Sequence, residues 1–489
     1  MLNAKLKLFI ENFLVYGVGG IISKVVPLLM LPIITRLMPN TEYFGIYDLS
    51  NTLISFAVYF CILGMYDAMY RMFFEKDDEE YKVKICSTSF IFNLVVSLIV
   101  LILMIIFSNQ ISELFFTNKK LAYLVYLCAI ATFVGGTNSI ISAPTRFQNK
   151  RMIFLITNTL SPIIAYSISI PLLFKGYYII ALPLAFLISN LFLEISFWCL
   201  NRKWFLFKQF DFLLLKELLV IAIPLFPNFL VYWIFNSCDR VMITNLIGIE
   251  NSGIYAVGSK LGMCSQLIYM AFAGGWQYFA FSTMKDANQV KNNSLVFEYL
   301  GVLSYISTLF VCAFSYYIFT VLFPAEYIGG FIIAPYLFLS PLLLMLFQVI
   351  ANQFLVVKKT WPNLLILSAG AITNVVLNFL LIPNYGIEGA AISTLVGYIL
   401  SDIICCIVLY KMKLFISSIK FIFLSFVFII AFVLWRLCFA TNLLFSTIIV
   451  ISVLFIYLLS YSNDLRILIL KKSNEYMHGW LSINRSSNS

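Results

Sequence analysis

Long apolar runs separated by short polar segments repeat along almost the whole chain. A helix of about 20 apolar residues is long enough to cross a lipid bilayer. The pattern predicts about fourteen transmembrane helices, at 9–37, 43–70, 85–107, 121–143, 153–174, 178–200, 217–247, 252–281, 295–323, 331–357, 361–382, 386–410, 415–438 and 441–462. The fold class expected from this pattern is an all-α polytopic membrane protein, with both termini on the same side of the membrane.

Composition and charge placement support this prediction. Of the 489 residues, 62% are hydrophobic and 11% are charged, whereas a soluble domain carries about 25% charged residues. The net charge is +10, and 24 of the 32 Lys and Arg residues fall in the tails and in the loops on the side of the tails. Because Lys and Arg accumulate in cytoplasmic loops, we expect a multi-pass protein of the inner (plasma) membrane with both termini in the cytoplasm. The same placement argues against a nucleic-acid partner.

An internal repeat is visible at an offset of 208 residues. The tripeptide Gly45–Tyr47 recurs at Gly253–Tyr255, and at the same offset Glu194 falls on Asp402. Repeats in parallel orientation are related by an axis along the membrane normal. The sequence therefore predicts two six-helix bundles related by a pseudo-two-fold along the membrane normal, followed by two additional C-terminal helices.

This repeat sets the expected domain boundaries. The segment between the two copies mixes Trp, Phe and Lys, as is typical of an interfacial helix. The predicted units are an N-terminal bundle (1–200), an interfacial cytoplasmic linker (201–216), a C-terminal bundle (217–410), helices 13 and 14 (411–462) and a cytoplasmic tail (463–489).

Charged residues inside the apolar runs mark the candidate functional site. Asp239, Arg240 and Lys260 lie in the seventh and eighth predicted helices, and Lys24 lies in the first. Each such charge costs roughly 2.5–3.5 kcal/mol at mid-membrane depth, so these side chains are expected to face a watery cavity or a partner. The three cations suit a diphosphate with a long apolar tail, since Arg offers forked donors and Lys a point charge. Tyrosines such as Tyr232 are candidates for stacking on sugar rings, together with Tyr16 and Tyr255.

A structural interpretation of these charges stays open. Asp239 paired with Lys260 would lock two helices together without meeting any substrate. Successive residues on a helix diverge by about 100°, which predicts that Asp239 and Arg240 face different directions.

Three segments resemble a known family. The segments 35–47 (TRLMPNTEYFGIY), 238–261 (CDRVMITNLIGIENSGIYAVGSKL) and 382–397 (IPNYGIEGAAISTLVG) are similar to signatures of bacterial polysaccharide flippases in the multidrug/oligosaccharidyl-lipid/polysaccharide exporter superfamily. The resemblance implies two six-helix bundles around a central cavity and alternating access for an undecaprenyl-diphosphate-linked oligosaccharide, such as an O-antigen repeat unit. The cavity cations of the family would correspond here to Lys24, Arg240 and Lys260, and we add Asp239 to the candidate substrate-binding residues.

The predicted function is thus a flippase and not an enzyme. We expect a monomer that contacts membrane lipids and works beside a polysaccharide polymerase and glycosyltransferases. No cofactor is expected, although Glu194 and Asp402 are candidates for coupling transport to a proton or sodium gradient.

Two alternatives remain. A cation-coupled multidrug antiporter of the same superfamily would favour acids over cations in its cavity, which is the opposite of the balance expected here. A membrane-embedded polysaccharide polymerase or glycosyltransferase would normally need a sizeable outward loop, and none of the predicted outward loops is long.

Overall fold

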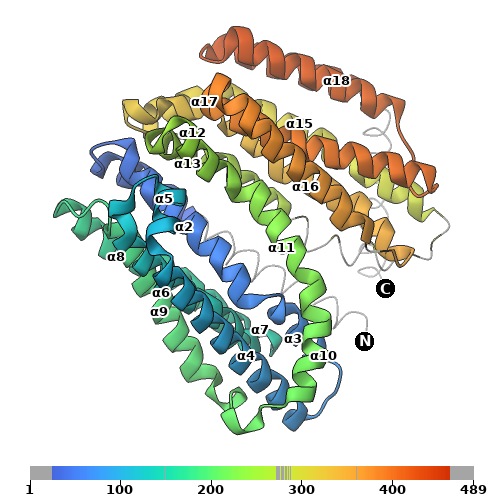
Figure 1. The fold of residues 1–489 in the computed structure, drawn as a ribbon. Coiled ribbons are helices and arrows are strands. Elements are labelled where there is room, and N and C mark those ends of the chain that lie inside the picture. Colours follow the sequence, from blue (N-terminus) through green and yellow to red (C-terminus); the bar gives the residue numbers. More distant parts are fainter. Residues whose placement is uncertain are drawn as a thin grey trace, which may run out of the picture.

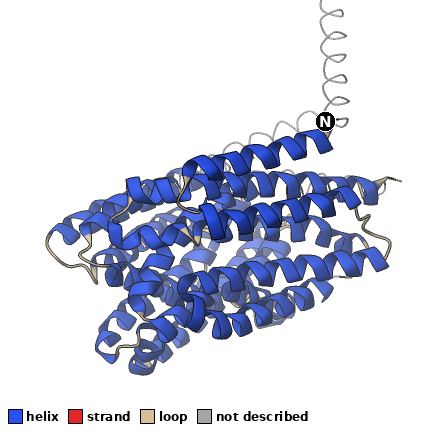
Figure 2. Cartoon of the chain, turned by 90° about the horizontal axis from the view of Figure 1, so that it is seen from above, coloured by secondary structure: helices blue, strands red, loops and turns tan. Residues whose placement is uncertain are grey.

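The computed structural model describes residues 25–462, except 149, 271, 273–275, 277–279, 281–282, 285, 287 and 360. This part of the chain consists of helices joined by loops and contains no strand (Figures 1 and 2). Eleven of its helical segments are long and apolar enough to cross a membrane. The predicted all-α membrane fold is therefore confirmed.

The exact number of membrane-spanning helices stays a prediction. The first and eighth predicted helices fall partly outside the described residues. The eleventh and twelfth form one helical run, Trp361–Lys411, that breaks at Gly386 with a φ of 58° and a ψ of −140°. Glycine suits this break because residues with a side chain rarely adopt such a positive φ.

The N-terminal half begins with an apolar helix over Val25–Leu37. It continues with α2 (Thr41–Ile62), α3 (Met65–Phe73), α4 (Glu79–Ile106), α5 (Ser108–Phe116), α6 (Ala122–Ile141), α7 (Ala143–Phe147), α8 (Arg151–Phe174) and α9 (Ala181–Asn201). These helices form the bundle that runs from blue to green in Figure 1.

The connection between the halves differs from the predicted interfacial helix. It contains two short 3₁₀ turns, Arg202–Trp204 and Phe207–Gln209, before α10 (Phe212–Ala222) begins. Trp204 and Phe205 are buried against the N-terminal half, so these aromatic residues anchor the connection in the protein core. Asp211 caps α10 by accepting hydrogen bonds from the backbone N–H groups of residues 213 and 214.

The C-terminal half forms the second bundle in Figure 1. It contains α11 (Phe226–Trp233), α12 (Asp239–Ile247), α13 (Ile249–Gly262), α15 (Gln289–Leu322), α16 (Ala334–Val356) and α17 (Trp361–Lys411), followed by α18 (Ile419–Leu434) and α19 (Leu443–Ser460). Helix α16 lies at the centre of this half, with 83% of its most apolar window buried.

The two halves meet where the repeated tripeptides cross. Gly45 on α2 lies against Gly253 on α13, at equivalent positions of the two repeats. A Cβ atom added to Gly253 would lie 2.0 Å from the backbone O of Thr41, and one added to Gly45 would lie 2.5 Å from the backbone O of Ile249. Glycine is required at both positions because neither backbone can yield to a side chain.

An apolar cluster closes the same end of the molecule. It unites Leu31, Ile34 and Phe44 of the N-terminal half with Val257 and Phe331 of the C-terminal half. This is the end that the charge distribution places outside. The halves are thus joined at their predicted outer ends.

The glycine contact generates the first prediction. Gly253→Ala should lower the apparent melting temperature of the purified protein, because overpacking of this kind typically costs about 1–3 kcal/mol. The matched control is Gly329→Ala, whose new Cβ would meet its nearest neighbour, Ile254 Cγ2, at an ordinary 3.7 Å. Equal melting temperatures for the two variants in the same detergent would contradict the prediction.

A candidate anion-binding site between the two halves

The site is built on a distorted helix. Between α11 and α12, the chain forms a π-helical turn over Ile234–Cys238. A π turn widens the helix by one residue and often marks functional positions. Asp239 and Arg240 follow this turn as the first two residues of α12 and are both buried, and the Arg240 Nη1 atom lies 3.6 Å from the Asp239 Oδ1 atom. Their main partners differ, because Arg240 bonds to Asp48 on α2 whereas Asp239 accepts hydrogen bonds from Tyr255 and Thr394. This agrees with the expectation that the two side chains face different directions.

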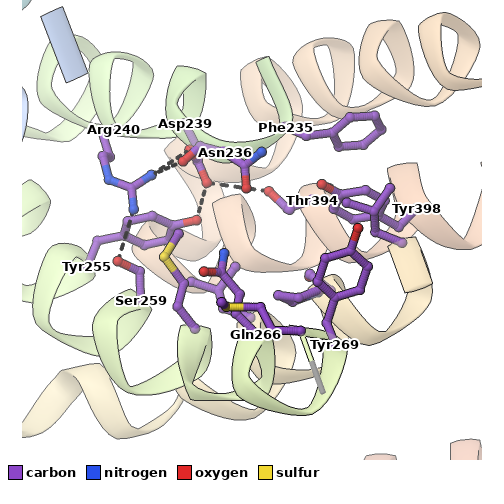
Figure 3. A pocket seen from close by; sticks show the side chains of 16 residues that line it. Phe235, Asn236, Asp239, Arg240, Tyr255, Ser259, Gln266, Tyr269, Thr394 and Tyr398 are labelled. Carbon is purple, nitrogen blue, oxygen red and sulfur yellow. Dashed lines mark hydrogen bonds and ion pairs between the residues drawn. The ribbon is translucent and has the colours of Figure 1, made fainter. Parts of the chain in front are cut away.

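Arg240 is almost completely buried, with a side-chain exposure of 5%. Its Nε donates to the Asp48 Oδ2 atom at 2.5 Å, and its Nη2 donates to the Ser259 Oγ atom at 3.0 Å. Its Nη1 donates to the backbone O of Asn236, one helical turn earlier. All three nitrogens of the guanidinium are thus held by the protein (Figure 3 shows its contacts with Ser259 and Asp239).

Asp48 is the partner that sequence reasoning missed. It lies on α2, directly after the first Gly-Ile-Tyr tripeptide, and its side chain is 3% exposed. One carboxylate oxygen accepts the bond from Arg240, and the other lies 3.6 Å from the Lys260 Nζ atom. The available signal was an acid in an otherwise apolar segment, next to a repeated motif.

Lys260 is the accessible member of this cluster. Its side chain is 39% exposed, and it lines a cavity of about 450 Å³ together with Tyr47 and Asn51. Arg240 and Asp239 line a neighbouring cavity of about 270 Å³, and Met263 and Gln266 border both spaces. The structure therefore brings Arg240 and Lys260 together across one shared carboxylate, at the border of two adjoining cavities.

Asp239 faces the second bundle. Its Oδ2 atom accepts hydrogen bonds from the Tyr255 hydroxyl and, at 3.4 Å, from the Thr394 Oγ1 atom on α17 (Figure 3). Tyr255 is fully buried by this contact, so it is not available for stacking on a sugar. The alternative pairing of Asp239 with Lys260 is not formed, because Lys260 pairs with Asp48 instead.

The charges of this cluster are balanced. Asp48 and Asp239 match Arg240 and Lys260, so the described residues do not show the expected surplus of cations. Lys24, like Tyr16, lies outside the described residues. An excess of cations in the cavity therefore no longer argues against an antiporter.

The two predicted coupling residues lie apart from the cluster. Glu194 on α9 accepts a hydrogen bond from the Thr137 Oγ1 atom at 2.5 Å and is partly buried. Asp402 on α17 is 8% exposed, and its Oδ1 atom has no hydrogen-bond partner in the described part of the chain. Neither residue shares a hydrogen bond or an ion pair with Asp48, Asp239 or Arg240 in that part.

The family of this chain follows from a comparison with family models. The model described as "Polysaccharide biosynthesis protein" matches residues 33–329. The chain belongs to this family. A sequence comparison with curated proteins finds no match.

Solved structures confirm the fold. The lipid II flippase MurJ, in an inward closed conformation, is similar with a TM-score of 0.71 and 18% identity over 93% of this chain and 100% of that chain. A multidrug resistance MATE transporter of the MOP superfamily, facing inward, matches with a TM-score of 0.63 and 14% identity over 80% and 94%. A transporter of the same superfamily from Pyrococcus furiosus, whose binding pocket is described as having reverse polarity, has a TM-score of 0.58 and 14% identity over 83% and 95%. The resemblance seen in the sequence is thus confirmed for the family and the fold.

The shared carboxylate generates the second prediction. Asp48→Asn should destabilise the protein, because it removes the carboxylate that accepts a hydrogen bond from the buried Arg240 and leaves Asp239, 3.6 Å away, as its remaining charged partner. Breaking a buried ion pair typically costs about 3–5 kcal/mol. Asp48→Asn combined with Arg240→Gln should recover part of this loss, as a double-mutant cycle measured by thermal unfolding would show.

The control removes another ion pair. Asp77 pairs with Lys82 at 2.8 Å but is fully exposed, and although this hydrogen bond lowers the pKa of Asp77, exposed pairs add little stability. Asp77→Asn should leave the melting temperature unchanged. A loss in Asp48→Asn no larger than that in Asp77→Asn would show that Arg240 does not depend on Asp48.

Proposed function

We propose that this protein is a flippase that moves an undecaprenyl-diphosphate-linked oligosaccharide, such as an O-antigen or similar repeat unit, across the bacterial inner membrane by alternating access. The observation that carries the proposal is the pair of cations, Arg240 and Lys260, held by one acid of the opposite half. The polysaccharide biosynthesis family supplies the class of substrate. The fold shared with the lipid II flippase supports the same conclusion.

The geometry suggests how a diphosphate is recognised. Asp48 is the anion that Arg240 and Lys260 hold in this structure. A diphosphate offers more negative charge and more acceptor oxygens than one carboxylate, and charge-assisted bonds to Arg are among the strongest in proteins. In this mechanism, the headgroup enters beside Lys260, takes over the two cations and releases Asp48.

Release of Asp48 would loosen the connection between the halves. The ion pairs cross from α2 to α12 and α13, beside the contact of Gly45 with Gly253. A ligand shifts a conformational equilibrium only through a difference in affinity for the two states. The diphosphate meets this condition if it binds best to the state in which Asp48 no longer occupies the cations.

The third prediction tests Arg240 as the phosphate ligand. The assay uses proteoliposomes and measures when a fluorescent undecaprenyl-diphosphate oligosaccharide becomes accessible to an impermeant glycosidase. Arg240→Lys keeps the charge but loses the forked donors, so the initial rate should fall at least about tenfold, which corresponds to about 1.4 kcal/mol. The matched control is Arg36→Lys, an exposed arginine that bonds to the backbone O of Val321. Equal rates in the two variants would count against Arg240 as a forked ligand.

A cation-coupled multidrug antiporter is the second candidate. It is favoured by the balanced charges of the cluster and by the similarity to MATE transporters. In the same liposomes, an antiporter would export a cationic dye against an imposed ion gradient and leave the glycolipid in place. Flipping of the glycolipid without dye transport supports the flippase.

The fourth prediction concerns the coupling ion. A carboxylate inside an apolar bundle without a cationic partner is stabilised by binding a proton or a metal ion, and Asp402 meets this description within the described part of the chain. We expect Asp402→Asn or Glu194→Gln to remove the dependence of transport on a proton or sodium gradient. Glu250→Gln, at an exposed position on α13, should keep it. Unchanged gradient dependence in both test variants would leave Glu194 and Asp402 as packing residues.

A further inference from the structure

A third cavity lies at the opposite end of the molecule from the glycine contact. Its volume is about 940 Å³, near the upper end of the range of about 300–1,000 Å³ that ligand pockets occupy. It lies between α3 and the chain from Pro224 to Tyr232 on one side and the end of α16 and the start of α17 on the other. The charge distribution of the loops places this end on the cytoplasmic side.

Aromatic rings form much of the wall. Phe272 stacks on Trp276 with a ring-centre distance of 5.4 Å and an interplanar angle of 24°. Trp361, at the start of α17, is 65% exposed. The aromatic residues lining this cavity are Phe229, Tyr232, Tyr269, Phe272, Trp276, Phe347 and Trp361. Flat rings of this kind pack against the C–H faces of pyranose sugars.

Side-chain amides provide the polar part of the wall. Asn228, Asn352 and Asn363 line the cavity. The Asn363 Oδ1 atom is buried without a hydrogen-bond partner in the described part of the chain. An amide offers both a donor and an acceptor, which matches the mixed donor and acceptor character of sugar hydroxyls. Buried polar atoms without partners are costly in proteins, so a ligand hydroxyl at this place would relieve that cost.

The charge of this cavity contrasts with that of the anion-binding site. Among its described lining residues, Asp67 is the single ionisable side chain that carries a charge at neutral pH. Arg240 and Lys260 line the other two cavities. An acidic group brought into the aromatic cavity would meet the like charge of Asp67 and find no cation among the described residues that line it. Like charges close together repel each other, and less so the more water lies between them.

The cavity and the cations are connected along one helical path. Tyr269 lines both the aromatic cavity and the cavity of Arg240. Asn228 and Tyr232 precede Arg240 by twelve and eight residues, which correspond to about 12–18 Å along a helix. An oligosaccharide of a few sugars attached to a diphosphate can bridge this distance.

We propose that the aromatic cavity binds the glycan of the lipid-linked substrate and selects for sugars without acidic groups. This inference rests on the proposed flippase function and adds the class of sugar to it. The diphosphate and the glycan are recognised at separate places, the first by cations and the second by stacking and amide hydrogen bonds. Rejection of acidic glycans is then a consequence of unpaired charge, which is a common basis of specificity.

The test compares three lipids with the full-length protein in nanodiscs. The probes are undecaprenyl diphosphate alone, the same lipid with a neutral trisaccharide of N-acetylhexosamines, and the same trisaccharide with one hexuronic acid. Dissociation constants are measured by native mass spectrometry. We expect the neutral glycan to bind roughly tenfold or more tightly than the bare lipid, a gain of about 1.4 kcal/mol, and the acidic glycan to show no gain over the bare lipid.

Variants locate the effect in the cavity. Trp361→Ala should reduce the preference for the neutral glycolipid over the bare lipid, whereas Phe174→Ala, an exposed aromatic residue that does not line this cavity, should retain that preference. Asp67→Asn, at an exposed position, should narrow the gap between the neutral and acidic glycolipids several-fold.

The outcomes separate this inference from the proposed function. Equal affinity for all three lipids, or tighter binding of the acidic one, would overturn the selectivity while leaving the flippase proposal intact. A neutral preference that survives Trp361→Ala undiminished would overturn the assignment to this cavity. No binding of any of the three lipids would overturn both proposals.

Discussion

The structure depends on keeping one arginine buried in a membrane-spanning helix. Arg240 has little contact with water, and an unpaired guanidinium at this depth would be prohibitive. Its main partner is the Asp48 carboxylate on the other half of the molecule, with Ser259 and the backbone O of Asn236 completing its hydrogen bonds. Because the two charges come from different halves, this ion pair forms only while the halves are together. Burial of one charge therefore links local stability to the relative position of the two bundles.

The ion-pair cluster around Arg240 is accessible from one side. Lys260 shares the same carboxylate but is partly exposed, so one edge of the cluster is accessible from a cavity. A buried ion pair is a weak source of net stability, whereas its disruption is expensive unless a new partner arrives. An anionic ligand that reaches Lys260 first would supply that partner. In the proposed mechanism, the atoms that stabilise the contact between the halves are also those that bind the substrate.

Much of the fold was predictable from the sequence, because transmembrane helices follow from length and hydrophobicity alone. The order of residues alone was enough to identify the apolar runs, the repeated Gly-Ile-Tyr tripeptide and the charges at positions 239, 240 and 260. The partners of those charges were not predictable in the same way. The pairing of Arg240 with Asp48 joins residues 192 positions apart, and the π turn that precedes Asp239 has no clear sequence pattern. Helical periodicity gives the direction in which a side chain leaves its own helix, but it does not say which residue of another helix that side chain meets.

The contact between Gly45 and Gly253 shows where the two repeats are equivalent and where their sequences differ. At this crossing, each repeat presents the same tripeptide to the other. The backbone contact is therefore formed by equivalent residues of the two repeats. The next residue breaks that equivalence, since Asp48 follows the first tripeptide and Ala256 follows the second. The two halves therefore meet through equivalent backbone positions, while a single acidic residue on the N-terminal copy pairs with Arg240 and Lys260. An exchange at position 48 would alter the charge at this crossing without altering the backbone contact between Gly45 and Gly253.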